Sequence, residues 1–185
     1  MTDQGTWEAI LKMAKEQGAT DAVVIVFQSE ESMVRFSNNE VTVVDRLKEK
    51  TAEIFVKVES RKASTNLTEF SEESIRSAVA KVVRAAANSP PGDVYEPLPE
   101  GPFTYQTSLL NKPPVPLDEK STVDWVEAAI YGGLKEGAER MAGSLIAANS
   151  AITLLTTGNV FTEAHNSTIE LSTRAFGKGK ASGHS

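Results

Sequence analysis

The stretch that decides the fold is Ser32-Met-Val-Arg-Phe-Ser-Asn-Asn-Glu-Val-Thr-Val43, in which two apolar runs flank a short polar segment. Met33 to Phe36 and Val41 to Val44 have the composition of strands. Asparagine tolerates the left-handed backbone conformation that a tight turn needs, and Asn38 and Asn39 lie between the two runs. The stretch therefore predicts a β-hairpin.

Further strands are predicted on both sides of this hairpin. Residues 22–27 form a β-branched apolar run that is too short for a helix and is typical of a buried strand. Residues 52–59 alternate in a way that predicts a strand with one face exposed to water. Residues 146–156 and 160–176 are rich in Thr and β-branched residues and predict two more strands, joined by a turn at 158–159.

Two helices are predicted in the first half of the chain. Apolar residues at helical spacing follow Thr6, and Gly18 ends this segment. Ser71 opens a second helix, whose single apolar stripe runs from Ile75 to Ala86. Such a stripe needs a surface to pack on, and we expect the neighbouring strands to provide it.

A third helix is predicted after residue 120, with Ser121 or Thr122 as its cap. It contains Gly132 and Gly133, and its apolar face runs on through Gly137 to Met141. Each glycine costs about 1 kcal/mol relative to alanine in a helix interior. We therefore expect another backbone to approach this face closely.

All eight prolines lie between residues 88 and 117, where neither a helix nor a central strand can continue. We therefore predict an N-terminal α+β domain at residues 1–88, a linker or strap at 89–117 and a second α+β unit at 118–185. Large apolar side chains in the middle segment favour a strap lying on a surface over a linker without contacts: Tyr95, Phe103, Tyr105, Leu109 and Leu110.

The two halves also share an order of predicted elements, which is helix, strand, turn, strand and a basic segment with Ala-Ser. Residues 35–41 align with 154–160, and residues 61–64 align with 179–182. The alternative is a chance similarity, because the identity is low. The interpretation as a repeat predicts an α+β fold of small antiparallel sheets packed by helices, in two repeated units joined by the proline-rich strap.

Composition excludes several kinds of site. The net charge of −6 argues against direct contact with nucleic acid. The chain has no Cys and two His, and we interpret His165 and His184 as exposed loop residues, so no ordinary zinc site is expected within it. No apolar stretch of about 18 residues is present to cross a membrane. Together with the polar N-terminus, these features predict a cytoplasmic protein.

The charged clusters have simple interpretations. We expect Glu30 and Glu31 to be a solvated strand end. Lys178 and Lys180 are interpreted as a solvated tail, with an anion site as the less favoured alternative. Arg35 is unusual because it lies within an apolar strand, where it is expected to pair with a carboxylate such as that of Glu40; the alternative is that it faces a peptide or partner.

Several segments together resemble the N-terminal domain of the TldD/PmbA family, whose members are also called modulators of DNA gyrase. They are residues 18–22, the hairpin at 32–43, the strand ending near 62–65 and the helix start at 70–79. The resemblance covers residues 6–87 best, and the later predicted helix and strands follow the order of the family.

The resemblance implies a metal-dependent peptidase or its paired subunit, acting on unfolded or small peptides. In the catalytic branch the metal is held by an HExxxH helix that follows the region seen here, and this sequence has no such motif. We therefore expect a non-catalytic N-terminal part of a longer protein, with zinc only in the missing C-terminal half. The alternative is a stand-alone regulatory or binding module that pairs with a separately encoded C-terminal half.

In either case the expected partners are a peptide and a second subunit, in a homodimer or heterodimer, with no nucleic acid and no membrane. An exposed edge strand can bind an extended peptide as an added strand, and we expect such an edge at Met33–Phe36 or Ile152–Thr156. The residues predicted to contact a peptide or partner are Arg35, Asn38, Asn39 and Glu40.

Overall fold

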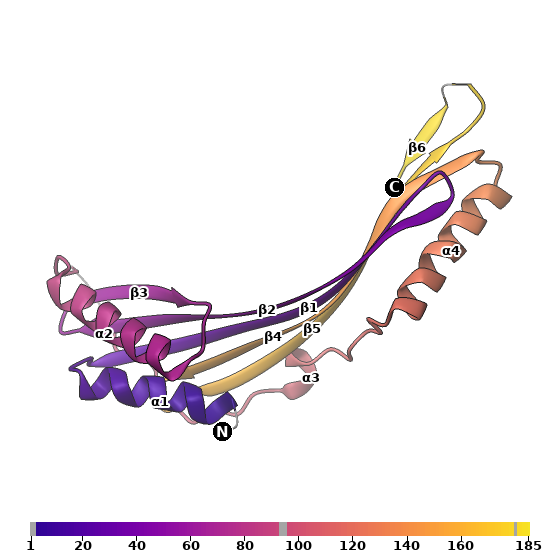
Figure 1. Ribbon diagram of the computed structural model, residues 1–185. Helices are drawn as coiled ribbons and strands as arrows, with labels where there is room; N and C mark the ends of the chain where they lie inside the picture. Colours follow the sequence, from indigo (N-terminus) through magenta and orange to yellow (C-terminus); the bar gives the residue numbers. More distant parts are fainter. Residues whose placement is uncertain (1–2, 93–95, 180) are drawn as a thin grey trace. The chain divides into compact units, whose positions relative to one another are not determined.

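A computed structural model describes residues 3–92, 96–179 and 181–185 (Figure 1). Tyr95 of the predicted strap and Lys180 of the predicted tail lie outside the described residues. The helices are α1 (Asp3–Glu16), α2 (Glu72–Asn88), α3 (Thr107–Leu110) and α4 (Glu119–Lys135). The strands are β1 (Asp21–Ser37), β2 (Glu40–Val58), β3 (Arg61–Leu67), β4 (Arg140–Thr156), β5 (Phe161–Phe176) and β6 (Ser182–His184). In the described ranges, no helix has both the length and the apolar character needed to span a membrane.

The strands are hydrogen-bonded in the order β3-β2-β1-β4-β5-β6. β2 pairs antiparallel with β3, and β5 pairs antiparallel with β6. β1 and β4 are antiparallel as well, because Thr157 N donates to Ala22 O at 2.9 Å whereas Asn39 N donates to Met141 O at 3.2 Å. The predicted α+β class with antiparallel strands is confirmed, although the strands form one hydrogen-bonded series and not several small sheets.

β1 and β2 are longer than the apolar pattern indicated. β1 joins the predicted strands at 22–27 and 33–36, and β2 joins those at 41–44 and 52–59. The polar residues between them interrupt the apolar pattern but not the strand, because an antiparallel strand tolerates polar side chains at solvated positions. The predicted turn between the strands is confirmed, with φ of 53° at Asn38 and 68° at Asn39.

The connectivity of the two halves repeats, as the sequence indicated. The order α1-β1-β2-β3 in the first half matches α4-β4-β5-β6 in the second. The aligned segments 35–41 and 154–160 both contain the turn between the first and second strands of their half. The third strands of the two halves, β3 and β6, lie at the two ends of the strand order. The first strands, β1 and β4, pair with each other in the middle of that order.

This order corrects the prediction of the edge strands. Met33–Phe36 belongs to β1 and Ile152–Thr156 to β4, and both strands have a neighbour on each side. The ends of the order are β3 and β6. The sequence did not reveal this because the pairing of β1 with β4 joins residues more than a hundred positions apart.

The chain divides into two compact units, each built from three segments. Unit 1 consists of Met1–Gln28, Lys50–Leu110 and Ala151–Ala164, and unit 2 of Ser29–Glu49, Asn111–Ser150 and His165–Ser185. Both units therefore take parts of β1, β2, β4 and β5. The predicted domains, residues 1–88 and 118–185, were each continuous in sequence. The two units of the structure interleave instead, because the long strands contribute to both.

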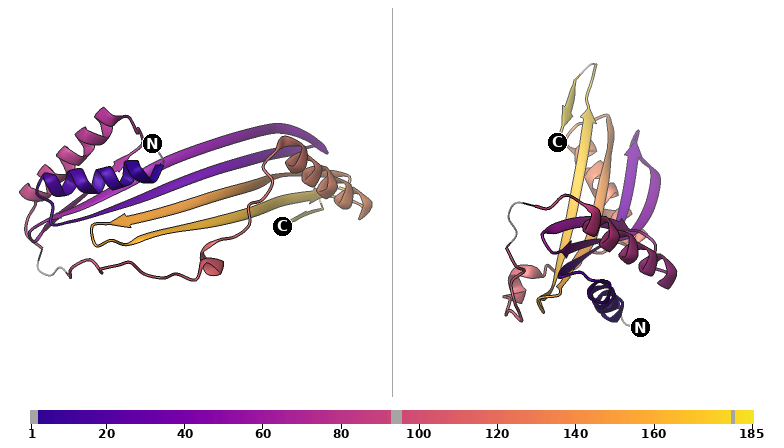
Figure 2. Two further views of the ribbon diagram at one scale, coloured as in Figure 1. Left: turned by 90° about the horizontal axis from the view of Figure 1, so that it is seen from below. Right: turned by 90° about the vertical axis from the view of Figure 1, so that its left-hand side faces the viewer.

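In unit 1, α1 and α2 pack side by side on one face of the strands (Figure 2). α2 begins as predicted, since the Ser71 hydroxyl accepts a hydrogen bond from Ser74 N at 3.3 Å. The predicted apolar stripe of α2 is also confirmed as buried: Ile75, Val79, Val82, Val83 and Ala86. Trp7 of α1 meets the ring of Phe70 edge-on, with the ring centroids 5.5 Å apart.

In unit 2, α4 packs through Val126 and Ile130 on apolar residues of β1 and β4. Its cap is Asp118 and not Ser121 or Thr122, so the predicted cap was wrong. The Asp118 carboxylate accepts hydrogen bonds from Ser121 N at 2.9 Å and from Ser121 Oγ at 2.8 Å. The two bonds hold the pKa of Asp118 below its ordinary value, and the bond from Ser121 N makes the larger contribution.

Close packing at one α4 glycine comes from a side chain. A Cβ at Gly133 would lie 2.5 Å from Met141 Sδ, so the expected approach of a backbone is replaced by that of a methionine side chain. A Cβ at Gly132 would meet no atom within 4 Å. The predicted extension of the helix to Met141 is wrong, because α4 ends at Lys135, Gly137 follows it with a φ of 98° and Met141 lies in β4. Only Gly133 therefore has a packing reason.

The backbone of the proline-rich segment is hydrogen-bonded to the turn between β4 and β5 and to β4 itself. In unit 1, Gly101 N donates to Gly158 O at 2.7 Å. In unit 2, the Asn149 side chain forms two hydrogen bonds of 2.9 Å with the backbone N and O of Val115. The large apolar side chains of this segment bury less surface than the sequence predicted, since Leu109 is 78% exposed.

Candidate functional site

The four residues predicted to contact a peptide or partner lie at the end of the β1–β2 hairpin in unit 2. Arg35, Asn38 and Glu40 are exposed, and Asn39 is half-buried. The Arg35 guanidinium forms no ion pair with any described residue, so its predicted pairing with Glu40 is wrong. Thr42 lies opposite Arg35 instead, and its hydroxyl donates to Arg35 O at 3.2 Å.

Asn39 holds the hairpin turn against the start of β4. Its Oδ1 accepts a hydrogen bond from Met141 N at 2.7 Å, and its Nδ2 donates to Glu139 O at 3.2 Å. Both amide atoms are therefore used within unit 2. Because the two contacts flank Arg140, Asn39 fixes the backbone that carries this arginine. The sequence could not show this role, since the partners are about a hundred residues away.

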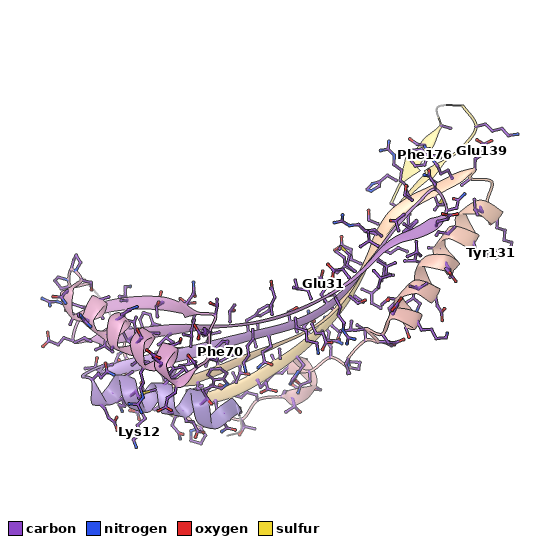
Figure 3. The ribbon with its side chains drawn as sticks, in the orientation of Figure 1. Lys12, Glu31, Phe70, Tyr131, Glu139 and Phe176 are labelled. Carbon is purple, nitrogen blue, oxygen red and sulfur yellow. The ribbon has the colours of Figure 1, made fainter. Side chains whose placement is uncertain are left out.

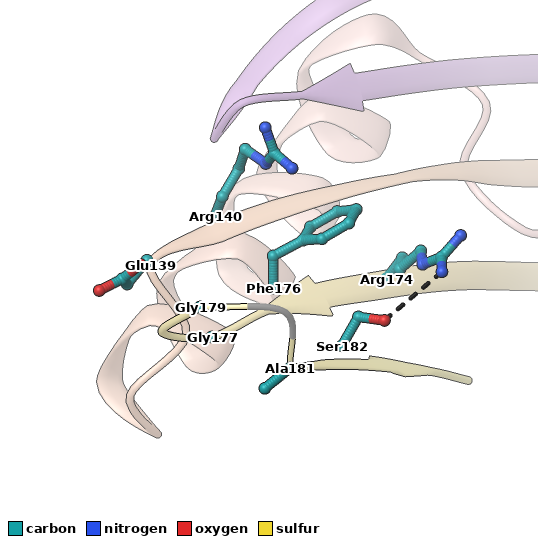
Figure 4. A pocket seen from close by; sticks show the side chains of 8 residues that line it. All are labelled: Glu139, Arg140, Arg174, Phe176, Gly177, Gly179, Ala181 and Ser182. Carbon is teal, nitrogen blue, oxygen red and sulfur yellow. Dashed lines mark hydrogen bonds between the residues drawn. The ribbon is translucent and has the colours of Figure 1, made fainter.

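Arg140 lies at a cavity of about 520 Å³ in unit 2, which we call the Phe176 pocket (Figure 4). The lining residues come from the start of β4, the end of β5 and the turn that leads to β6: Glu139, Arg140, Arg174, Phe176, Gly177, Gly179, Ala181 and Ser182. The sequence offered no motif for this pocket, because it forms only when the two strand ends lie side by side.

Two guanidinium groups share the Phe176 ring. Arg140 Cζ is 4.2 Å from the ring centroid and Arg174 Cζ is 5.4 Å from it, both within the range of cation–π contacts. Arg174 Nη2 also donates to Ser182 Oγ at 3.4 Å. The Glu139 carboxylate points away from the ring (Figure 4). Neither arginine forms an ion pair within the part of the chain that the structure describes.

The segment interpreted as a solvated tail forms one wall of this pocket. Gly177 N donates to Ala181 O at 3.0 Å, and Gly179 takes a φ of 72°, which glycine adopts without strain. The chain can thereby turn back and pair β6 with Arg174–Phe176 of β5. Lys178 is exposed as predicted, but it lies in a turn and not in a tail.

Both histidines are exposed, as predicted, but they belong to strands and not to loops. His165 is in β5, and its carbonyl oxygen accepts a hydrogen bond from Lys112 N at 3.0 Å. His184 is in β6 opposite Arg174, and its Nε2 lies 3.1 Å from Ser172 Oγ.

Glu30 lies inside β1 and belongs to a charged cluster, so its interpretation as a solvated strand end is wrong. Its carboxylate pairs with Arg46 and with Lys48, whose Nζ is 3.2 Å away. The hydrogen bond from Lys48 is the main reason that the pKa of Glu30 lies below its ordinary value.

In the described ranges, no group of three or more His, Cys, Asp or Glu residues is arranged to hold a metal ion.

A second cavity, of about 480 Å³, lies in unit 1. It is lined by residues of α1 and α2 together with Phe70, and Figure 3 shows Lys12 and Phe70 at this site. Its charged residues pair with one another, Lys12 with Glu16 at 3.8 Å and Arg76 with Glu72 at 2.6 Å. The Phe176 pocket differs in that its cations are not neutralised by a described carboxylate, so we take it as the candidate functional site.

No protein-family model and no curated protein matches this sequence. Solved structures do match it. TldE from Thermococcus kodakarensis has a TM-score of 0.74 at 15% identity, over 96% of this chain and 40% of that chain. A "putative modulator of DNA gyrase" from Bacteroides thetaiotaomicron has a TM-score of 0.73 at 11% identity, over 98% and 43%. A protein of the same description from Thermotoga maritima has a TM-score of 0.70 at 14% identity, over 99% and 42%.

The present chain thus spans about two fifths of the length of each of these structures. Sequence identities of 11 to 15% are too low for a residue-by-residue comparison of sites. The structural match nevertheless covers 96 to 99% of this chain. The chain therefore has the fold that is found in TldE and in these gyrase-modulator structures.

Proposed function

We propose that this chain is a non-catalytic, N-terminal part of a TldD/PmbA-type peptidase or peptidase partner, which forms one wall of a peptide-binding channel and a dimer interface. The observation that carries the proposal is the fold match over 96 to 99% of this chain, which leaves more than half of each neighbour unmatched. The segments at 18–22, 32–43 and 70–79 that resemble the family are the second support.

An unpaired edge of β2 in unit 2 supports the proposed interface. β3 pairs only with Ala52–Val58, so residues 40–49, the part of β2 in unit 2, have no neighbouring strand on that side in the described part of the chain. The same stretch exposes apolar side chains, with Val43 44% and Leu47 50% exposed. An open edge with exposed apolar groups is typical of a strand that pairs with another chain or with an extended peptide.

The proposal assigns no catalytic step to this chain. The chain has no Cys and two His, and no three His, Asp or Glu residues in the described ranges are grouped to hold a metal ion, so we propose that any zinc of the complete protein is held outside this chain. The net charge of −6 supports a peptide partner over nucleic acid, and the cysteine-free composition supports a cytoplasmic location.

Metal analysis and a peptidase assay on the purified chain test the assignment of roles. We expect less than stoichiometric zinc after dialysis and no cleavage of a fluorogenic unfolded peptide. A zinc content of one per chain, or cleavage that is abolished by a chelator and restored by zinc, would contradict the non-catalytic role.

The dimer interface is tested by sedimentation velocity. We expect the wild-type chain to dimerise and Leu47→Lys to shift it to monomer, because a charge on the open edge opposes strand pairing. Tyr131→Lys is the matched control, since Tyr131 is 70% exposed on α4 of the same unit (Figure 3). If the wild-type chain is a monomer at all concentrations, or if both variants behave alike, the β2 interface is wrong.

A further inference from the structure

The Phe176 pocket concentrates positive charge in an acidic chain. Its lining contains two arginines and one glutamate, whereas the whole chain carries a net charge of −6. Lys178, in the turn beside the lining glycines, is exposed and adds a third cation nearby. A cationic pocket of this kind attracts anions locally while the rest of the chain repels them.

The geometry of the arginines favours a planar anion. Each guanidinium lies over the Phe176 ring, with Cζ 4.2 Å from the ring centroid for Arg140 and 5.4 Å for Arg174. The five N–H donors of a guanidinium lie in its plane, and Arg174 uses one of its nitrogens for Ser182. The remaining donors have the fork geometry that matches the two oxygens of a carboxylate.

The other lining groups leave room beside such an anion. Gly177 and Gly179 have no side chains, and Ala181 has only a methyl group. Phe176 is half-buried and presents an apolar surface between the two cations. The pocket therefore combines two anion-binding forks with an apolar contact for a neighbouring side chain.

We propose that the Phe176 pocket binds a carboxylate of a peptide, with Arg140 and Arg174 as the binding residues and Phe176 as the apolar contact. The carboxylate is either the C-terminal one or that of an Asp or Glu side chain. The choice of a peptide rests on the proposed function, whereas carboxylate recognition rests on the pocket alone. Asn39 is a positioning residue, because it holds the backbone on both sides of Arg140.

The pocket is tested first with small probes. In NMR spectra of the wild-type chain, N-acetyl-leucine should shift the arginine Nε–H signals of Arg140 and Arg174, and N-acetyl-leucinamide should not. The double variant Arg140→Gln/Arg174→Gln should bind N-acetyl-leucine about tenfold more weakly or worse, as expected for the loss of charged hydrogen bonds. Arg174→Lys keeps the charge but loses the fork, and it should also weaken binding.

Arg84→Gln is the matched control for the loss of charge. Arg84 is exposed on α2 of unit 1 and forms no ion pair with a described residue. It should leave the binding of N-acetyl-leucine unchanged. Equal weakening by Arg84→Gln, or equal shifts with the leucinamide, would overturn carboxylate recognition. So would inorganic phosphate that binds at lower concentration than N-acetyl-leucine.

Three fluorescein-labelled peptides then identify the source of the carboxylate by anisotropy. One ends in a free leucine, the second is the same peptide with an amidated end, and the third is amidated and carries an internal glutamate. Tenfold weaker binding on amidation assigns the C-terminal carboxylate, and rescue by the glutamate assigns an acidic side chain. Either result must be lost in the double arginine variant.

The two proposals can fail separately. If all three peptides bind the double arginine variant as they bind the wild type, the pocket assignment is overturned and peptide binding stands. If N-acetyl-leucine binds at the arginines but no peptide binds, carboxylate recognition stands and the proposed peptide-binding role is overturned.

Discussion

Replacing Thr122 with valine should destabilise unit 2 more than replacing its buried partner Ser32 with alanine. Ser32 lies on β1 and Thr122 in the first turn of α4, and their hydroxyl oxygens are 3.4 Å apart. Ser32 is 2% exposed and Thr122 is fully buried. Neither hydroxyl can therefore turn to solvent if its partner is removed.

The direction of this hydrogen bond follows from the neighbours of Thr122. Thr122 Oγ1 lies 3.2 Å from Asp118 O and 3.2 Å from Glu119 O, and both carbonyls can only accept. Because a hydroxyl has one proton, Thr122 donates to the helix backbone and accepts from Ser32. Thr122 is thus the acceptor on which the Ser32 hydroxyl depends.

The expected free-energy changes are unequal for this reason. Thr122→Val leaves a buried hydroxyl without an acceptor, which costs about 1–3 kcal/mol. Ser32→Ala leaves Thr122 bonded to the helix backbone, so about 0.5–1.5 kcal/mol is expected. The double variant buries no unsatisfied group, and it should be more stable than Thr122→Val alone.

The assay is urea unfolding followed by tryptophan fluorescence. Trp125 lies in unit 2 and Trp7 in unit 1, so a Trp7→Phe background makes the signal specific to unit 2. If Ser32→Ala is the more destabilising change, or if the effects of the two single changes simply add, then the deduced hydrogen-bond direction is refuted.

Three further predictions concern the packing, charge and turn of unit 2. Gly143→Ala should lower the unfolding free energy of unit 2 by about 1–3 kcal/mol, because a Cβ there would collide with the backbone oxygen of Ser172 and lie 2.7 Å from Phe36 Cζ. An unchanged urea midpoint would disprove such tight packing. Glu30→Gln should flatten the acid limb of the stability profile. Because ion pairing with Lys48 lowers the pKa of Glu30 in the folded chain, the carboxylate stabilises the fold above its unfolded pKa and loses this contribution as the pH falls through the folded pKa. Identical wild-type and variant profiles would contradict the pairing. Asn39→Gly should cost about 1–3 kcal/mol through two lost hydrogen bonds, and Asn38→Gly less, since glycine suits both left-handed positions; equal urea midpoints would exclude the anchoring role of Asn39.

The features predicted well from sequence are those that neighbouring residues specify. The Ser71 cap and the buried stripe of α2 depend on contacts within one helix and on its periodicity. The hairpin at Asn38 and Asn39 depends on two consecutive left-handed residues. The Asp118 cap was missed because three residues within five positions, Asp118, Ser121 and Thr122, all have side chains suited to a cap.

Of the residues predicted from the sequence to contact a peptide or partner, only Asn39 bears on the candidate site. Asn39 was selected as a contact residue, and its amide proves to anchor the strand that carries Arg140. Arg174 and Phe176 gave no signal, because an arginine and an aromatic residue in a strand are ordinary features of an exposed sheet face. Their significance arises from Arg140, which lies more than thirty residues earlier in the chain.

The sequence by itself determined the α+β class, the repeated order of helix and strands, the hairpin turn and the absence of cysteine ligands. These depend on local propensity, on periodicity and on composition. Only the tertiary structure decided which strands lie at the ends of the series, how far β1 and β2 extend and where two arginines meet Phe176. The physical reason is that strand pairing is made by backbone hydrogen bonds between distant segments, such as β1 and β4, and these bonds carry little side-chain signature in either segment.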